Sequence, residues 1–172
     1  WSYEENPNTQ KRLLRDYLGH ETTSVERMYN QLSNSNKNLS LFDITFSEGV
    51  FIAKESVQTT LLRVRLNAPV PVFSFDREML LEKLSHLAGF HDIDFPDYPA
   101  FSDDFYVRGN DPEGVRAFFT PALISFFSAY GFYHIMCNGK ELLVRQFLRP
   151  ASAAEASAMI EFGLALKKKI DG

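Results

Sequence analysis

The sequence predicts an α+β fold: an antiparallel sheet of about six strands with helices packed mainly on one face. Residues 39–46 and 59–66 alternate apolar and polar side chains with the period of two that strands show. Residues 112–129 and 152–170 carry apolar residues at helical spacing behind residues that favour helix starts. The pair Asn138-Gly139 separates two β-rich runs, a strong signal for a hairpin. Strands joined by a hairpin, with the helical segments grouped separately, are typical of an α+β domain with an antiparallel sheet.

Length and composition limit the class of protein. The chain has 172 residues, 45% of them hydrophobic and 16 of them Phe, which favours one domain over residues 1–172 with an aromatic core. Residues 1–22 are expected to form a peripheral N-terminal helical segment. The formal net charge of −4 argues against a nucleic-acid partner, since duplex-binding domains usually have a basic face. A single cysteine excludes an internal disulfide, and this fits a reducing compartment.

The first elements of the chain include one ambiguity. Residues 9–18 predict a short helix. Residues 23–32 have a capping-box spacing and a helical apolar stripe, which favour a helix. The same residues could instead form a strand that pairs with 39–46 across the turn-like run 33–38. The pattern by itself favours the helix.

Two strands are predicted next. In the strand 39–46, residues Phe42, Ile44 and Phe46 share one face. In the strand 59–66, alternation places four residues inward and two arginines outward. The inward residues are Thr60, Leu62, Val64 and Leu66, and the outward ones are Arg63 and Arg65.

A helix and a loop follow the second strand. After a short extended piece, Asp76 is predicted to cap a helix over residues 77–88. Pro96 and Pro99 then predict an extended loop over residues 91–100, because the residue before a proline avoids the helical region.

In the aromatic-rich centre of the chain, the sequence predicts a strand followed by two helices. Residues 105–108 predict a strand, and Asp111 or Asn110 is placed to cap a helix that starts at Pro112. Thr120-Pro121 repeats the cap-and-proline signal, so a break is expected there. The predicted core residues of the two helices are Phe118, Phe119, Leu123, Phe126 and Phe127.

In the C-terminal part of the chain, the sequence predicts a β-hairpin followed by a helix. Residues 132–137 and 141–147 predict two strands joined by a type I′ turn with positive φ at Asn138 and Gly139. Cys137 in the first strand is expected to be a small core or edge residue. Ser152 and Glu155 form a capping box for the last helix. The predicted buried face of that helix contains Met159, Ile160, Gly163, Leu164, Leu166 and Ile170.

One cluster of residues offers possible chemistry. It consists of His91, Asp92, Asp94, Asp97, Asp103 and Asp104. Carboxylates that converge in a loop could bind Ca²⁺ or Mg²⁺, and the loop 92–104 could then serve a metal-dependent hydrolase. The spacing does not match an EF-hand, however, and apolar residues alternate with the acidic ones. The favoured interpretation is a loop anchored by Ile93, Phe95, Tyr98 and Phe101, with aspartates facing water.

No other pattern indicates catalysis. The chain contains no P-loop, HExxH, GxSxG or paired CxxC motif, so no catalytic residue, metal site or cofactor site is predicted. Arg63, Arg65, Arg145 and Arg149 could form a small basic sheet face. A solvated face is the default interpretation, and binding of anionic lipid or an acidic peptide is the alternative.

Several segments resemble an uncharacterised bacterial domain family whose members are often membrane-anchored. They are LFDITFSEG (41–49), PVFSFDREMLLEKL (71–84), the block 89–127 with its DIDF, FS, Y-x-VRG and FTP motifs, and NGKELLV (138–144). Where the family has LRPE, this chain has FDRE at residues 75–78. The family has no assigned activity, so the resemblance implies no catalytic residue.

The resemblance adds expectations about one strand and about the location of the protein, and the first residue of the chain adds another. It favours a strand for residues 27–32. The opening Trp1-Ser2-Tyr3 resembles a GWxY segment that follows membrane-spanning segments in the family, which implies a membrane tether outside this chain and a cytoplasmic location at the inner face of the membrane. Because the chain begins with Trp1 and not Met, we expect it to be a fragment or a processed product.

The leading functional hypothesis is therefore a non-enzymatic soluble module of a membrane-associated bacterial protein. It would bind a protein or a small ligand, without nucleic acid and without a cofactor. The alternative is the metal-dependent hydrolase described above. The two differ in whether the aspartates converge on a concave site or point separately into solvent.

Overall fold

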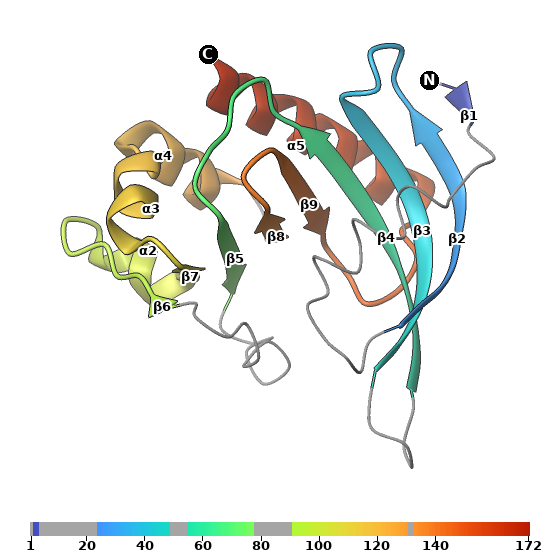
Figure 1. Ribbon diagram of the computed structural model, residues 1–172, viewed down its shortest axis with the longest axis horizontal. Helices are drawn as coiled ribbons and strands as arrows, with labels where there is room; N and C mark the ends of the chain where they lie inside the picture. The colour runs from blue at the N-terminus through green and yellow to red at the C-terminus, as the bar shows by residue number, and fades with distance from the viewer. Residues whose placement is uncertain (1, 4–23, 49–54, 78–90, 131–132) are drawn as a thin grey trace.

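The computed structural model describes residues 2–3, 24–48, 55–77, 91–130 and 133–172 (Figure 1). The described strands are β1 (Ser2–Tyr3), β2 (Ser24–Ser33), β3 (Leu39–Glu48), β4 (Glu55–Arg65), β5 (Phe73–Arg77), β6 (His91–Asp92), β7 (Phe105–Gly109), β8 (His134–Cys137) and β9 (Glu141–Arg145). The described helices are α2 (Pro99–Asp104), α3 (Pro112–Phe118), α4 (Pro121–Ala129) and α5 (Ala153–Asp171).

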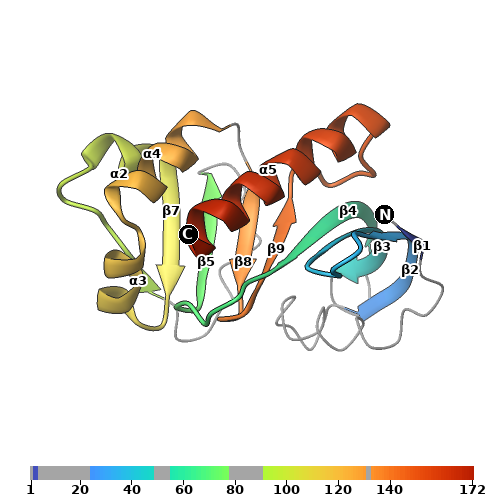
Figure 2. The same cartoon turned by 90° about the horizontal axis from the view of Figure 1, so that it is seen from above.

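The strands form one antiparallel sheet in the order β1-β2-β3-β4-β9-β8-β5-β7-β6. All four described helices pack against one face of it, with α5 lying across the middle strands and α2, α3 and α4 at one end (Figures 1 and 2). The α+β class and the one-sided helix layer are confirmed. The expected strand number is wrong: the described residues form nine strands, because β1 and β6 have two residues each and are too short to show a periodic pattern.

Residues 24–33 form a strand and not a helix. Met28 of β2 lies opposite Ile44 of β3, and both side chains are buried on the face away from the helices. The register between the two strands shifts twice along β2, and Asn30 has a φ of 53°. These irregularities interrupt the period of two, so the apolar residues fall at intervals that resemble helical spacing.

The strand β4 joins the long hairpins to the short strands. Leu62 and Val64 face the helices, where a Cβ on Gly163 of α5 would overlap the Leu62 side chain. The glycine therefore permits a close approach of α5 to the sheet. Arg63 points to the opposite face as predicted, but it is only 9% exposed and donates a hydrogen bond to Ser40 Oγ at 3.0 Å.

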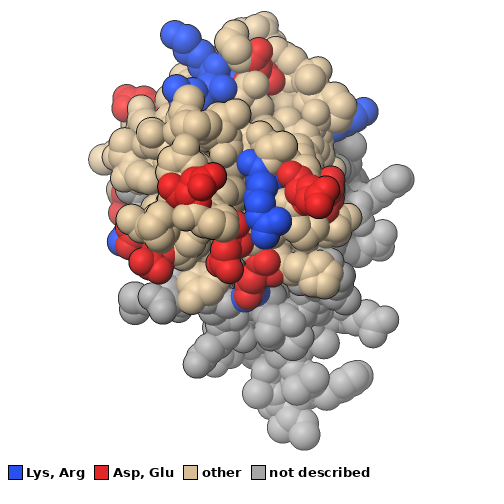
Figure 3. Space-filling view, turned by 90° about the vertical axis from the view of Figure 1, so that its left-hand side faces the viewer, with Lys and Arg blue, Asp and Glu red and all other residues tan. Residues whose placement is uncertain are grey.

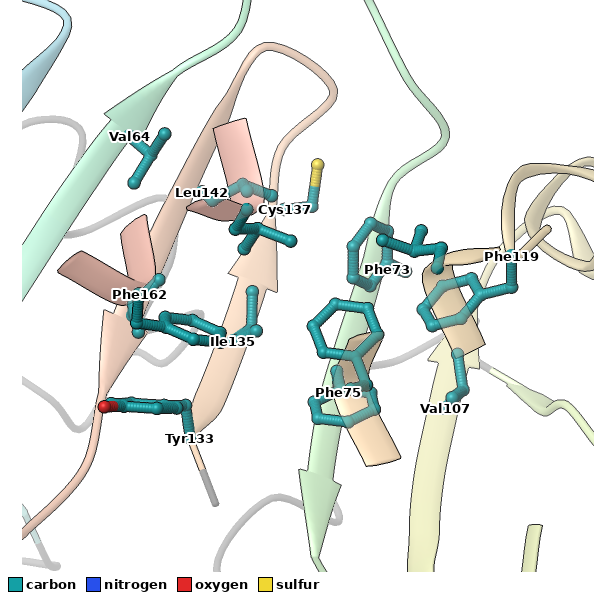
Figure 4. Close-up of a cluster of buried hydrophobic side chains, with 14 of the residues drawn as sticks. Val64, Phe73, Phe75, Val107, Phe119, Tyr133, Ile135, Cys137, Leu142 and Phe162 are labelled. Atoms are coloured by element: carbon teal, nitrogen blue, oxygen red, sulfur yellow. The ribbon is translucent and has the colours of Figure 1, made fainter. Parts of the chain in front are cut away.

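The main core is aromatic, as the sequence predicts (Figure 4). Phe75 of β5 stacks on Phe127 of α4 with 4.4 Å between ring centroids. Phe119 meets Phe73 edge-on at 5.2 Å, an arrangement that aromatic rings favour. Of the predicted core residues in α3 and α4, Phe119, Leu123 and Phe127 are buried, and Phe118 and Phe126 pack against the core while partly exposed.

The helix caps predicted at Asp111, Thr120 and Ser152 are confirmed. The Asp111 carboxylate accepts a hydrogen bond from the Gly114 amide at 3.0 Å, and Thr120 Oγ1 accepts one from the Leu123 amide at 3.3 Å. The Ser152 capping box at the start of α5 is complete. Each of these caps satisfies amide groups that have no acceptor inside the first turn of a helix.

Some predictions about helices are wrong. The predicted loop 91–100 and the residues after it contain α2, for which Pro99 supplies the first position. Asp76 and Arg77 belong to β5 and do not start a helix. Leu164 of α5 is 49% exposed, because the helix buries Met159, Phe162, Gly163 and Leu166 on its other side. The predicted helix 9–18, and residues 78–88 of the predicted helix 77–88, lie outside the described residues.

None of the described helices is long and apolar enough to cross a lipid bilayer.

The hairpin between β8 and β9 is present, but its turn is one residue later than predicted. The amide of Asn138 donates to the Glu141 carbonyl at 3.2 Å, so Gly139 and Lys140 are the central residues. Gly139 has a φ of 96°, and among the described non-glycine residues only Asn30 and Lys37 have positive φ. Positive φ at the first central position alone is typical of a type II′ turn and not of type I′. The Asn138 side-chain oxygen accepts from the amides of Lys140 (3.1 Å) and Glu141 (2.9 Å).

Substitution of Gly139 by valine should destabilise the fold by more than about 1 kcal/mol, because a β-branched residue resists positive φ. The new Cβ would also lie 3.3 Å from the Val70 carbonyl oxygen. Chemical denaturation measures the effect, with Lys140→Val as the control at a neighbouring turn position without positive φ. Equal free energies of unfolding for Gly139→Val and the parent chain would contradict the turn geometry.

Candidate functional site

The predicted aspartate loop lies at the end of the sheet that carries β6 and β7. Its apolar residues behave as expected: Ile93, Phe95 and Phe101 are buried, and Tyr98 is half-buried against the core. The backbone of Ile93 extends the pairing of β6, since its amide donates to the Val107 carbonyl at 2.8 Å. The alternating pattern in this stretch thus reflects anchoring of a surface segment.

The acidic side chains of this loop do not converge. Asp92 forms an ion pair with Arg108, with 2.6 Å between Oδ1 and Nε, and Asp104 lies 3.9 Å from Arg77. The cluster residues His91, Asp92, Asp94, Asp97, Asp103 and Asp104 are all exposed. Within the described ranges, no group of three or more His, Cys, Asp or Glu residues could hold a metal ion. The geometry therefore does not favour the hydrolase alternative.

The acidic residues do give this end of the molecule its charge. Residues 91–130 contain seven Asp or Glu and two Arg, a formal charge of −5. The whole chain carries −4, so the other 132 residues together carry +1. Figure 3 faces this end and shows carboxylates on several sides of one basic stretch. We call residues 91–130 the acidic lobe.

A groove lies in the helix layer of the acidic lobe, between α2 and α4. It has a volume of about 510 Å³ and is open to solvent along one side. Phe101 and Ile124 are buried at its base, and the remaining lining residues are half-buried or exposed. Those residues are Tyr98, Pro99, Ala100, Ser125, Ser128 and Ala129.

This groove was not predicted from the sequence. Prolines in residues 91–100 pointed to a loop, and without α2 one wall of the groove is missing. The other wall carries a weak signal: Ser125, Ser128 and Ala129 are small residues that recur at helical spacing on α4. Small side chains on an exposed helix face leave room for atoms from another molecule.

A buried histidine–aspartate pair lies on the sheet face away from the helices. His134 of β8 and Asp76 of β5 are 2.8 Å apart, Nδ1 to Oδ2, and their side chains are 7% and 6% exposed. A carboxylate only accepts hydrogen bonds, so the neutral imidazole donates from Nδ1. Burial lowers the pKa of His134, with the nearby Arg145 acting in the same direction and Asp76 opposing it. In the described chain no hydroxyl or thiol group hydrogen-bonds to His134, so the pair lacks a nucleophile to activate.

The remaining candidate residues are used structurally. Burial raises the pKa of Cys137 to about 12, so its thiol stays protonated at neutral pH. Three of the four arginines of the possible basic face are engaged by neighbouring groups. Arg63 is buried, Arg65 pairs with Glu141 at 3.2 Å, and Arg149 forms two hydrogen bonds with the carboxylate of Glu155.

Comparisons with known proteins give one fold likeness. No family model matches the chain, and no curated protein does. A solved structure, the crystal structure of the mycobacterial trehalose monomycolate transport factor A, TtfA, is similar with a TM-score of 0.46 and 11% sequence identity. The alignment covers 97% of this chain and 94% of that one. At this level of similarity the likeness implies no shared function.

The free energy of unfolding should fall as pH drops below about 6.5, the pKa of an unperturbed histidine. Since the pKa of folded His134 is lowered, the unfolded state binds the extra proton first, and stability rises with pH between the two values. Denaturation between about pH 5.5 and about pH 7.5 measures the slope. His134→Gln should flatten it and the exposed control His91→Gln should not. A rise in the His134 pKa above the unperturbed value in an NMR titration would contradict this prediction.

Millimolar Ca²⁺ or Mg²⁺ should not raise the melting temperature, because the loop carboxylates are spread over the surface. A true site would add about 2.7 kcal/mol of stability at a hundredfold excess of metal over its Kd. Thermal melts with added metal and with chelator measure the effect. A saturable rise that disappears in the Asp92→Asn, Asp94→Asn double variant would overturn this prediction.

Proposed function

We propose that this chain is a non-enzymatic binding module of a membrane-associated bacterial protein, and that it binds a partner protein through the groove between α2 and α4. The observation that carries the proposal is the groove itself. It presents apolar side chains to solvent within the acidic lobe, whose formal net charge is −5. Exposed apolar surface with a polar rim marks interaction sites on soluble domains.

The shape of the groove supports a protein partner over a small ligand. Its volume of about 510 Å³ is within the range of ligand sites, but ligand sites usually enclose most of the ligand surface. A groove that is open along one side covers only one face of its occupant. Protein segments are bound in this manner, with one or two side chains inserted and the rest of the segment in contact with other surfaces.

The non-enzymatic part of the proposal is supported by the state of the reactive groups. Catalysis by acid, base or nucleophile needs such groups within reach of a substrate. In the part of the chain that the structure describes, His134 and Asp76 are buried and paired with each other, and the Cys137 thiol is protonated. The groove lining contains no His, Cys, Asp, Glu, Lys or Arg.

Membrane association is supported by the family resemblance. The matching segments lie between residues 41 and 149, and the opening Trp1-Ser2-Tyr3 resembles the stretch that follows membrane-spanning segments in that family. Attachment at the inner face of the membrane would place the acidic lobe in the cytoplasm, next to other proteins of the same membrane.

Photo-crosslinking in cells tests the proposal. A benzophenone amino acid at Ser125, on one wall of the groove, or at Ala100, on the other, should give the same discrete adduct with another protein. The control position is Ala154 in the first turn of α5, which is exposed and lies at the far end of the helix layer (Figures 1 and 2). Equal adduct formation at all three positions, or none at the two groove positions, would count against a binding groove.

A further inference from the structure

We infer that the segment bound in the groove is basic and carries a large apolar anchor residue, an inference that rests on the proposed function. Two features of the acidic lobe lead to it. Exposed aspartates flank the lining residues 98–101 in the chain and form what we call the rim, and the interior has space lined by small side chains. Complementary charge steers a partner and fixes its orientation, whereas apolar burial supplies affinity.

Three aspartates lie close in the chain to lining residues, one just before α2 and two within it. Asp103 and Asp104 follow the lining residues Pro99 and Ala100 by four positions, so they lie one helical turn further along the same side of α2. Asp97 immediately precedes the lining residue Tyr98 in the chain. Asp97, Asp103 and Asp104 are all exposed.

The arginines of the acidic lobe are engaged away from this rim. Arg108 pairs with Asp92, and Arg116 Nε donates to the Asp94 carbonyl oxygen at 3.0 Å. Arg77 of β5 approaches Asp104 only to 3.9 Å, and both side chains are more than half exposed. Asp97, Asp103, Asp104 and Arg77 together carry a formal charge of −2, so this part of the surface stays negative.

The space inside the groove is the reason to expect a large apolar anchor residue in the partner. Ala100, Ser125, Ser128 and Ala129 are small, and Ser128 Oγ already donates to the Ile124 carbonyl at 3.0 Å. Its hydroxyl proton is therefore not presented to a ligand, and the base of the groove is formed by apolar side chains. A leucine, methionine or phenylalanine side chain from the partner would fill this space and leave its Lys and Arg neighbours at the rim. This pattern is typical of an amphipathic helix in a groove.

The test uses this chain and three fluorescent peptides of equal length. The first is an amphipathic helix of Lys and Leu, the second has its Leu residues replaced by Ser, and the third has its Lys residues replaced by Glu. Fluorescence anisotropy should show saturable binding of the first peptide only. Its affinity should fall as the salt concentration rises, since screening shortens the reach of exposed charges to about 8 Å at 0.15 M.

Two charge-matched variants separate the rim from general charge. Asp103→Asn with Asp104→Asn should weaken binding of the first peptide about fivefold, the effect of losing two exposed charge contacts. Glu26→Gln with Glu161→Gln removes two exposed carboxylates outside the acidic lobe and should leave the affinity unchanged. Ser128→Trp, which fills the groove, should abolish binding.

Each contrary result has a distinct meaning. Equal binding of the Glu peptide would overturn the basic character of the partner, and equal binding of the Ser peptide would overturn the apolar anchor. Equal effects of the two charge variants would show that the rim does not select the partner. In each of these cases groove-specific crosslinks would still support the proposed function. A dimer in light scattering that Ser128→Trp dissociates would make a second copy of this chain the occupant and would also overturn the inference.

Discussion

The positions of α2 and α4, and with them the groove, depend on aromatic packing around Phe75 and Phe119. The Phe75 ring centroid lies 6.1 Å from that of Phe101 in α2 and 4.4 Å from that of Phe127 in α4. Phe119, at the end of α3, contacts the same two rings at 6.1 and 5.7 Å. Both walls of the groove are therefore held against one strand by closely packed rings. Core packing of this kind transmits small displacements, so a change in the rings would alter the width of the groove.

The strand β5 contributes to both faces of the sheet because its side chains alternate. Phe73 and Phe75 enter the aromatic core, and Asp76 points to the other face to meet His134. Burying the Asp76 carboxylate costs desolvation energy, which the hydrogen bond from the neutral His134 offsets in part. The pair specifies the register, since a slip of one residue between β5 and β8 would place His134 among the aromatic rings. The strand β5 therefore holds both walls of the groove and specifies the register of the central strands.

Apolar and charged surfaces occupy separate positions in the acidic lobe. Apolar atoms line the groove, and the carboxylates belong to residues around it. The surface around the groove can stay hydrated because each aspartate is exposed. The buried residues Ile93, Phe95 and Phe101 hold the same stretch of chain to the core, so the charged surface is carried by a firmly packed segment.

The sequence by itself determined the features that depend on neighbouring residues. Caps at Asp111, Thr120 and Ser152 involve groups three residues apart, and the alternation in β3 correctly places Phe42, Ile44 and Phe46 on one face of that strand. Tertiary structure decided the rest. The sheet extends to nine described strands because two-residue strands form only where a partner edge is available. Asp76 is a strand residue because its backbone pairs with Tyr106 of β7, and its carboxylate meets His134, 58 positions later. The groove exists because α2 and α4 pack on the same ring, which is a contact between distant residues that no local pattern records.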